Sequence, residues 1–172
     1  MTKPNLQKQS LITQEYLRSI LHYDPATGIF RWRVRRNKHP AGTRAGSVIA
    51  NGRRTIDING HTYYAHRLAV LYVTGKWPVD GVDHRSRSPD INHIENLRPA
   101  TQQQNCRNRS VRSDSASGVS GVNWHAKQNR WHAQIQVDKG KRLHLGSFTS
   151  FEKAAEARRA AELRYFGEFA PG

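Results

Sequence analysis

The chain of 172 residues has one cysteine, few acidic residues and no long apolar run. A lone thiol, Cys106, excludes an internal disulfide and the cysteine-rich zinc sites of ribbons and fingers. No stretch approaches the ~18 apolar residues that a membrane-spanning helix needs. The first residues also lack the apolar segment of a secretory signal. We therefore expect a protein that stays out of membranes and acts inside a cell.

The shortage of acidic residues makes the chain strongly basic. It has 28 Lys and Arg against 13 Asp and Glu, a net charge of +15 and a pI near 10.8. Residues 1–110 hold 18 of the basic and 7 of the acidic residues, which is a net +11. Such a potential attracts polyanions, of which nucleic acid is the commonest in a cytoplasm. A membrane surface would need an amphipathic helix that the sequence lacks. A role in solubility alone is the remaining alternative.

Local patterns in the first 78 residues predict a small α+β layer. Thr13 is a typical N-cap, Gly75 ends a buried apolar segment, and Asn-Gly pairs at 51–52 and 59–60 are typical hairpin turns. The predicted elements are a helix over residues 13–21, strands over 29–34, 53–58 and 61–64, and a helix over 65–73. With 36% hydrophobic residues and a mean hydropathy of −0.80, small cores are expected.

A serine-rich segment separates this part from a second pattern. Residues 110–120 contain five serines and one glycine, which is typical of a linker. Alternating apolar and polar residues then predict strands over 121–126, 130–137 and 142–148, before a helix over 150–166. The predicted organisation is a first domain over 1–109, a linker over 110–120 and a second domain over 121–172.

Residues 82–108 combine the side chains that phosphodiester hydrolysis requires. A carboxylate at Asp83 and an amide at Asn105 could bind a hard divalent cation through oxygen. His84, with an ordinary pKa near 6.5, could take a proton from water at neutral pH. A second amide could hold its ring in one tautomer. A helix that starts at the Pro-Ala-Thr of residues 99–101 is expected to carry Asn105.

The spacing of these residues resembles the HNH endonucleases of the phage homing type. His84 and Asn96 are 12 positions apart, Asn96 and Asn105 are 9, and a His-Arg-Leu-Ala sequence lies upstream at 66–69. The resemblance spans about residues 13–108 and implies the ββα-metal (His-Me finger) nuclease fold, within an α+β class. It implies that His84 is the general base and that Asn96 orients its ring. It further implies that Asp83 and Asn105 hold one Mg²⁺ or Mn²⁺ ion.

The loop after His84 departs from that family because it is basic. Arg85 and Arg87 bring two positive charges close to the implied metal ligands. We expect them, with Arg98, to contact DNA phosphates; weakened metal binding is the alternative. Among the nine histidines only His84 is assigned to chemistry, and His66 is expected to be structural.

Residues 118–169 resemble the APETALA2/ERF DNA-binding domain. That resemblance implies a three-stranded antiparallel sheet, packed on one helix, whose residues enter the major groove of DNA. The sheet residues expected to face DNA are Asn123, Arg130, Trp131, Gln134, Gln136 and Arg142. The turn residues expected to meet phosphates are Lys127, Lys139 and Lys141. Asparagine and glutamine suit adenine more than guanine. In the alternative, Trp124 and Trp131 are core aromatics and the lysines are ordinary turn charges.

Together these features predict a metal-dependent DNA endonuclease with a separate DNA-binding module. The resemblance implies a homing enzyme of a phage or prophage that acts on double-stranded DNA in the bacterial cytoplasm. We expect a monomer that uses Mg²⁺ or Mn²⁺ and no small-molecule cofactor, and that either nicks or cuts both strands. The alternative is a non-catalytic DNA-binding regulator that retains a silent nuclease fold. RNA binding ranks last, because no RNA-binding motif is present.

Overall fold

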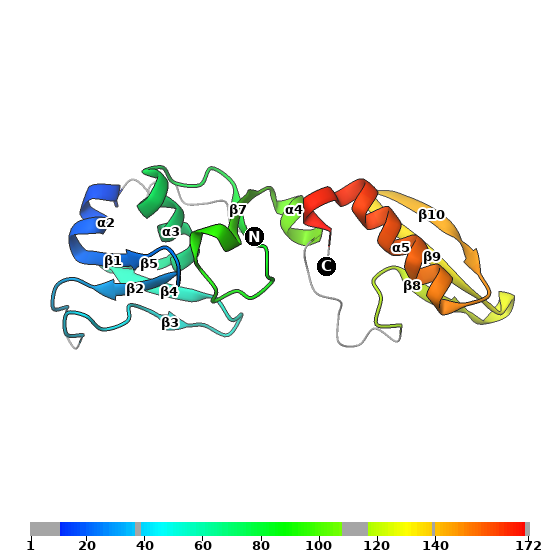
Figure 1. Ribbon diagram of the computed structural model, residues 1–172, viewed down its shortest axis with the longest axis horizontal. Coiled ribbons are helices and arrows are strands. Elements are labelled where there is room, and N and C mark those ends of the chain that lie inside the picture. The colour runs from blue at the N-terminus through cyan, green and yellow to red at the C-terminus, as the bar shows by residue number, and fades with distance from the viewer. Residues whose placement is uncertain (1–10, 37–38, 108–116, 139, 171–172) are drawn as a thin grey trace. The chain divides into compact units, whose positions relative to one another are not determined.

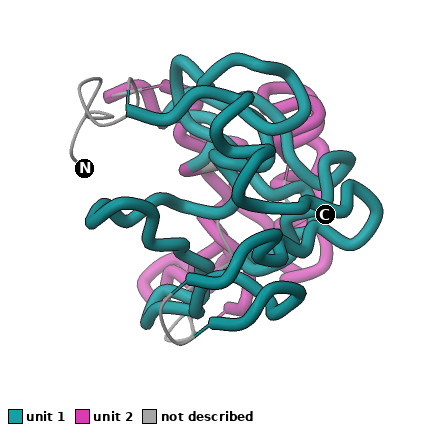
Figure 2. Tube along the Cα trace, turned by 90° about the vertical axis from the view of Figure 1, so that its left-hand side faces the viewer, with its two compact units in different colours: residues 1–105 teal, residues 106–172 magenta. Residues whose placement is uncertain are grey.

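The structure, a computed structural model, describes residues 11–36, 39–107, 117–138 and 140–170. The chain divides into two compact units, Met1–Asn105 and Cys106–Gly172 (Figure 2). Both combine short antiparallel sheets with helices, which is the mixed α+β class that the sequence predicts. No helix in the described ranges is both long enough and apolar enough to cross a membrane. Residues 108–116, which form much of the predicted linker, and Lys139 lie outside the described residues.

The first unit begins with a helix and two small antiparallel sheets (Figure 1). Thr13 caps the first helix as expected, since its hydroxyl accepts a hydrogen bond from the backbone N–H of Tyr16 at 3.1 Å. Asn59 and Gly60 both have positive φ, as a tight hairpin turn requires. The elements are α2 (Gln14–Ile20), β1 (Leu21–Asp24), β2 (Ile29–Trp32), β3 (Ser47–Val48), β4 (Arg54–Ile58), β5 (His61–Tyr64) and α3 (Ala65–Thr74). The strand β1, which pairs with β2, was not predicted from the sequence.

One apolar core holds these elements together. Leu17 of α2, Ile56 of β4 and Leu68 of α3 are fully buried in it. Burying such a side chain stabilises a fold by about 1.5–3 kcal/mol. Val82 and Leu97, from the strands that follow α3, belong to the same cluster. The core therefore anchors those strands against the N-terminal layer.

Two strands and a short helix complete the first unit. The strand β6 (Gly81–His84) pairs antiparallel with β7 (Leu97–Ala100), and α4 (Gln102–Arg107) follows. A 3₁₀ turn, η1 (Ile94–Asn96), leads into β7. The helix starts later than predicted: Pro99 lies in β7, where a two-stranded sheet tolerates a residue without an N–H. Thr101 and Gln104 then cap α4 reciprocally, at 3.2 and 2.8 Å.

The second unit is a three-stranded antiparallel sheet with one long helix, as the sequence predicts. Its strands lie in the order β10-β9-β8. Ser150 caps the helix by accepting a hydrogen bond from the backbone N–H of Lys153 at 3.2 Å. The elements are β8 (Val122–His125), the 3₁₀ turn η2 (Ala126–Gln128), β9 (Arg130–Asp138), β10 (Lys141–Phe148), α5 (Phe151–Phe166) and the 3₁₀ turn η3 (Gly167–Phe169).

The helix α5 covers one face of this sheet with small side chains. Ala133 and Ile135 of β9 are buried against Ala154 and Ala161 of the helix. Trp131 lies on the same face, and its ring centroid is 5.0 Å from that of Phe151. The expectation that Trp131 faces DNA is therefore corrected. Strand residues two apart share a face, so Trp131 points toward the helix with Ala133 and Ile135.

In the first unit, Gly28 provides a test of how closely the turn between β1 and β2 packs against the loop at residues 92–93. Its φ is +72°, and a Cβ there would overlap the backbone of Asn92 and His93. Gly60 has a similar φ of +77° with nothing within 4 Å. We expect Gly60→Ala to lose about 1–2 kcal/mol of unfolding free energy, the cost of a left-handed alanine. Gly28→Ala should lose clearly more in urea denaturation. Equal losses would show that the turn does not press on the loop at residues 92–93.

Candidate active site

The β6–β7 pair brings the acid and the imidazole of the predicted site together. Asp83 and His84 are both 6% exposed, and they point to opposite faces of β6 because they are consecutive strand residues. Asp83 is paired in register with Arg98, and His84 with Leu97. The carboxylate of Asp83 and the imidazole of His84 thus lie at the end of β6, on opposite faces of the strand.

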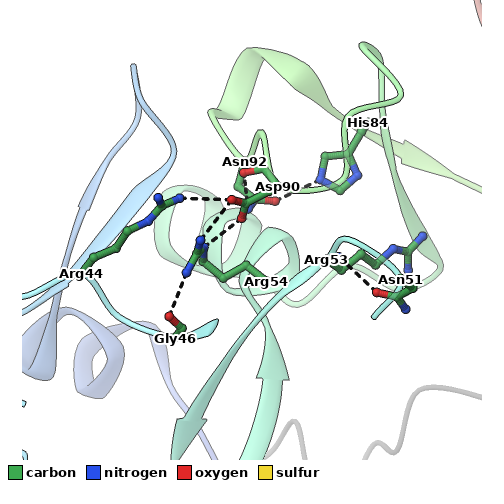
Figure 3. A network of polar contacts seen from close by, with 8 residues as sticks. All are labelled: Arg44, Gly46, Asn51, Arg53, Arg54, His84, Asp90 and Asn92. Atoms are coloured by element: carbon green, nitrogen blue, oxygen red, sulfur yellow. Dashed lines mark hydrogen bonds and ion pairs between the residues drawn. The ribbon is translucent and has the colours of Figure 1, made fainter. Parts of the chain in front are cut away.

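The imidazole of His84 is held by the amide of Asn92. The ring Nε2 lies 3.0 Å from the side-chain oxygen of Asn92 (Figure 3). The same amide donates its N–H to the carbonyl of Asp90 at 3.1 Å, which fixes its orientation. An amide oxygen only accepts, so Nε2 carries the proton and the lone pair of the neutral ring is on Nδ1. Asn92 was not predicted, although it lies in the polar loop that follows His84.

The electrostatic surroundings keep His84 neutral. Burial lowers the pKa of His84 below its usual value of 6.5, and the hydrogen bond that its ring donates to Asn92 partly offsets this. The charge of Arg53 lowers this pKa further, while Asp83 and Asp90 raise it. A base must be unprotonated to accept a proton. At neutral pH His84 is therefore in the form that general-base catalysis needs.

The N-terminal layer fixes the position of Asn92. Tyr23 of β1 donates its hydroxyl hydrogen to the backbone carbonyl of Asn92 at 2.8 Å, inside the core. Asp90 forms ion pairs with Arg54 at 2.8 Å and Arg44 at 3.3 Å (Figure 3). Arg54 also donates to the carbonyl of Gly46 at 2.8 Å. The β1–β2 turn and the β3–β4 region thus act on His84 through the loop that carries Asn92.

Asn96 closes the loop between β6 and β7. Its side-chain oxygen accepts from the backbone N–H of Ser86 at 2.8 Å, and its side-chain N–H donates to the carbonyl of Ile91 at 2.7 Å. Its backbone carbonyl accepts from Arg85 at 2.8 Å. These contacts differ from the expected one, since the amide bonded to Nε2 of His84 belongs to Asn92. Asn96 fixes the two residues that directly follow His84.

Asp83 is in a buried ion pair with Arg98. The Nε and one terminal nitrogen of Arg98 donate to the same carboxylate oxygen at 2.9 and 2.7 Å. Arg98 is 5% exposed, so the expectation that it contacts DNA is corrected. Removing one partner of a buried pair typically costs about 3–5 kcal/mol, because the other charge is left uncompensated. Arg98 therefore holds Asp83 in place and does not belong to the protein surface.

Asn105 lies beside the face of β6 on which Asp83 projects. A Cβ added to Gly81 would lie 2.6 Å from the side-chain nitrogen of Asn105 and 2.9 Å from the carbonyl of Ala100. Gly81 and Asp83 share a strand face, so the Asn105 amide occupies the space that Gly81 leaves open on the face from which Asp83 projects. A carboxylate and an amide are suitable ligands for a hard divalent cation. Among the described residues, no group of three His, Cys, Asp or Glu side chains could hold a metal ion.

The basic loop after His84 is on the surface. Arg85 and Arg87 are exposed, and Arg87 has a φ of 60° in the turn that reverses the chain. Arg53, which sequence reasoning missed, lies with its guanidinium 5.7 Å from the ring centre of Tyr64. Arg53 is close enough to His84 for its positive charge to lower the pKa of that imidazole.

The segment that carries this site was compared with known protein families. Residues 63–107 match the family model described as HNH endonuclease. The matched segment begins in β5, includes α3 and ends in α4. It contains Asp83, His84, Asn96 and Asn105. The match supports a nuclease with DNA as substrate, and nucleases of this family generally use a divalent metal.

The second unit places most of the predicted DNA-facing residues on the sheet face opposite α5. We call this surface the open face. Its register pairs Asn123 with His132 and Gln136 with Arg142. The residues of the open face are Asn123, His125, Arg130, His132, Gln134, Gln136, Arg142 and His144. Lys127 in η2 and Lys141 at the start of β10 are exposed at its ends. Sequence reasoning missed the three histidines of this face.

His66 is the buried histidine next to the candidate base. Its ring centre is 5.2 Å from that of His84, at an interplanar angle of 76°, and Tyr64 stacks on it at 5.3 Å. Its Nδ1 is buried without a hydrogen-bond partner in the described structure. Burial holds the pKa of His66 well below 6.5, and the charges of His84, Arg53 and Arg67 lower it further. His66 is thus a buried, uncharged ring that packs against the imidazole of His84.

This burial predicts a pH-dependent stability. A histidine whose pKa is lowered by folding stabilises the fold above its unfolded pKa, and the stability is lost as pH falls below about 6.5. The slope for one such proton is at most about 1.4 kcal/mol per pH unit. We expect His66→Phe to reduce the loss of unfolding free energy between pH 7.5 and 5.5, measured by urea denaturation. The exposed control His61→Phe should keep the wild-type slope; an unchanged slope in His66→Phe would exclude this role.

Proposed function

We propose that the protein is a metal-dependent DNA endonuclease that hydrolyses phosphodiester bonds at the β6–β7–α4 site. The observation that carries this proposal is the buried His84, held at Nε2 by Asn92, within a segment that matches an HNH endonuclease. A neutral imidazole fixed at one nitrogen is suited to take a proton through the other.

In the proposed reaction, Nδ1 of His84 takes a proton from a water molecule as its oxygen attacks phosphorus. The bond to the 3′ oxygen of the sugar breaks, and that oxygen receives a proton from solvent. Asp83 and Asn105 would hold a divalent cation, Mg²⁺ or Mn²⁺. Such an ion would stabilise the charge that develops on the phosphate and on the leaving oxygen. Arg85 and Arg87 would grip neighbouring phosphates, and Asn96 would keep their loop in place.

The open face of the second unit is the proposed DNA-binding surface. Arg130 and Arg142 supply charge, while Asn123, Gln134 and Gln136 could read base edges in the major groove. Lys127 and Lys141 would contact phosphates at the ends of the sheet, and Lys139 lies outside the described residues. A small nuclease joined to such a module gains local concentration at its target. The finer assignments, a homing-type enzyme of a phage or prophage that acts as a monomer, rest on the resemblance of the sequence.

The first test of the proposal is cleavage of supercoiled plasmid. We expect the purified chain with Mg²⁺ or Mn²⁺ to nick it, and EDTA to stop the reaction. His84→Ala should lower the rate by about 10²–10⁴-fold, the usual contribution of a general base. His61→Ala, an exposed histidine on β5, should leave the rate unchanged. If the wild type binds plasmid but leaves it intact with either metal, a silent nuclease fold with a regulatory role becomes the better account.

A second test addresses the metal ligands through Gly81. Gly81 does not have a positive φ, so alanine can adopt its backbone conformation, but its Cβ presses on the Asn105 amide and on the carbonyl of Ala100. We expect Gly81→Ala to raise the concentration of Mn²⁺ needed for half-maximal nicking by about tenfold, which corresponds to ~1.4 kcal/mol. Gly60→Ala is the control, because it strains the turn after β4 far from this amide. If both variants need the same Mn²⁺ concentration as the wild type, Asn105 is not a ligand.

A further inference from the structure

Three histidines from three neighbouring strands meet on the open face of the second unit. His125 of β8 and His132 of β9 stack with their ring centres 4.6 Å apart and an interplanar angle of 8°. His144 of β10 meets His132 edge-on, at 5.5 Å and 75°. The proposed nuclease reaction uses none of these three histidines. The cluster is also not a metal site, since no metal-binding group of three such side chains occurs in the described ranges.

The groups around this cluster are basic or neutral. Arg130 of β9 and Arg142 of β10 share the open face with it, and Lys127 lies in η2 next to His125. The carboxylate of Asp138, at the far end of β9, is the only one in the three strands. The helix α5 packs on the opposite face, where Arg158 donates to the backbone carbonyl of Gln134 and is paired with Glu162 at 2.8 Å. Charge complementarity therefore favours a polyanion on this surface.

The hydrogen bonds of the cluster hold the rings in place without supplying negative charge. Nε2 of His132 lies 2.6 Å from the side-chain oxygen of Gln128, and Nε2 of His144 lies 3.4 Å from the hydroxyl of Ser147. Nδ1 of His125 is buried and has no hydrogen-bond partner in the part of the chain that the structure describes. Neither a glutamine nor a serine compensates the charge of a protonated imidazole.

Protonating His132 is unfavourable in the free protein. Desolvation lowers the pKa of His132, and the neighbouring His125 and His144 lower it further. Two imidazolium rings at stacking distance would repel each other. A phosphate placed over the rings would favour the charged form. Binding and protonation must then be linked, with proton uptake when the anion binds.

We propose that His125, His132 and His144 form a proton-dependent contact for the phosphates of duplex DNA, so that the open face binds DNA more tightly as pH falls. This inference rests on the proposed DNA-binding role of the open face. It adds a dependence on pH that a surface of arginine and lysine alone would lack, because those side chains stay charged between pH 6 and 8.

The test measures DNA affinity against pH in the full-length chain. A fluorescently labelled duplex is titrated at pH 6.0 and pH 8.0, at constant ionic strength and in EDTA, so that no cleavage occurs. We expect the wild type to bind about tenfold more tightly at pH 6.0, since each proton taken up gives up to tenfold per pH unit. His132→Gln should reduce this ratio to less than threefold. His61→Gln, an exposed histidine of the first unit, should keep the wild-type ratio. Proton uptake, obtained by calorimetry in buffers of different ionisation enthalpy, should fall in His132→Gln alone.

Each other outcome overturns a defined part of the proposal. Equal affinity at both pH values, or a wild-type ratio in His132→Gln, means that the cluster does not couple protons to binding. DNA binding and plasmid nicking would then stand without it. If Arg130→Gln with Arg142→Gln leaves affinity unchanged at both pH values, DNA does not occupy the open face and this inference fails. The plasmid assay with His84→Ala remains a separate test of the nuclease.

Discussion

The candidate active site depends on one hydrogen bond, between Nε2 of His84 and the side-chain oxygen of Asn92. It selects the tautomer and leaves the basic lone pair on Nδ1. Other contacts in the first unit hold Asn92 in the position that this bond requires. Tyr23 anchors the backbone of Asn92, Gly28 lets the β1–β2 turn approach it, and Arg54 holds the neighbouring Asp90. The N-terminal layer therefore contributes to the site, because its contacts position the residue that binds His84.

The carboxylate of Asp83 and the imidazole of His84, both on β6, have opposite electrostatic surroundings. The carboxylate of Asp83 is buried beside the guanidinium of Arg98, at 2.7 Å. His84 and His66 stay neutral because they are buried among aromatic rings and near arginines. In the proposed reaction Asp83 would help to hold a cation and His84 would accept a proton, and these two roles need different surroundings. Alternation along a single strand separates them by one residue.

The two units use positive charge differently. In the first unit, arginines near the site are fixed by ion pairs and carbonyls, as in the Arg54–Asp90 pair. On the open face of the second unit, Arg130 and Arg142 share the surface with three histidines whose rings contact one another. Permanent positive charge gives affinity for any phosphate backbone, and this affinity falls as the salt concentration rises. In the proposed contact, the histidines would add a dependence of DNA affinity on pH.

The sequence by itself determined the features that depend on local backbone chemistry. The Thr13 cap, the Asn59–Gly60 turn and the alternation in β9 act over a few residues, so they could be predicted, as could the mixed α+β class. The linear spacing also singled out Asp83, His84 and Asn105 as candidates. Only the tertiary structure decided which amide bonds to His84, that Arg98 is buried, that Trp131 faces the helix and that three histidines stack. Those facts depend on strand register and on contacts across the fold, which residue spacing alone does not contain.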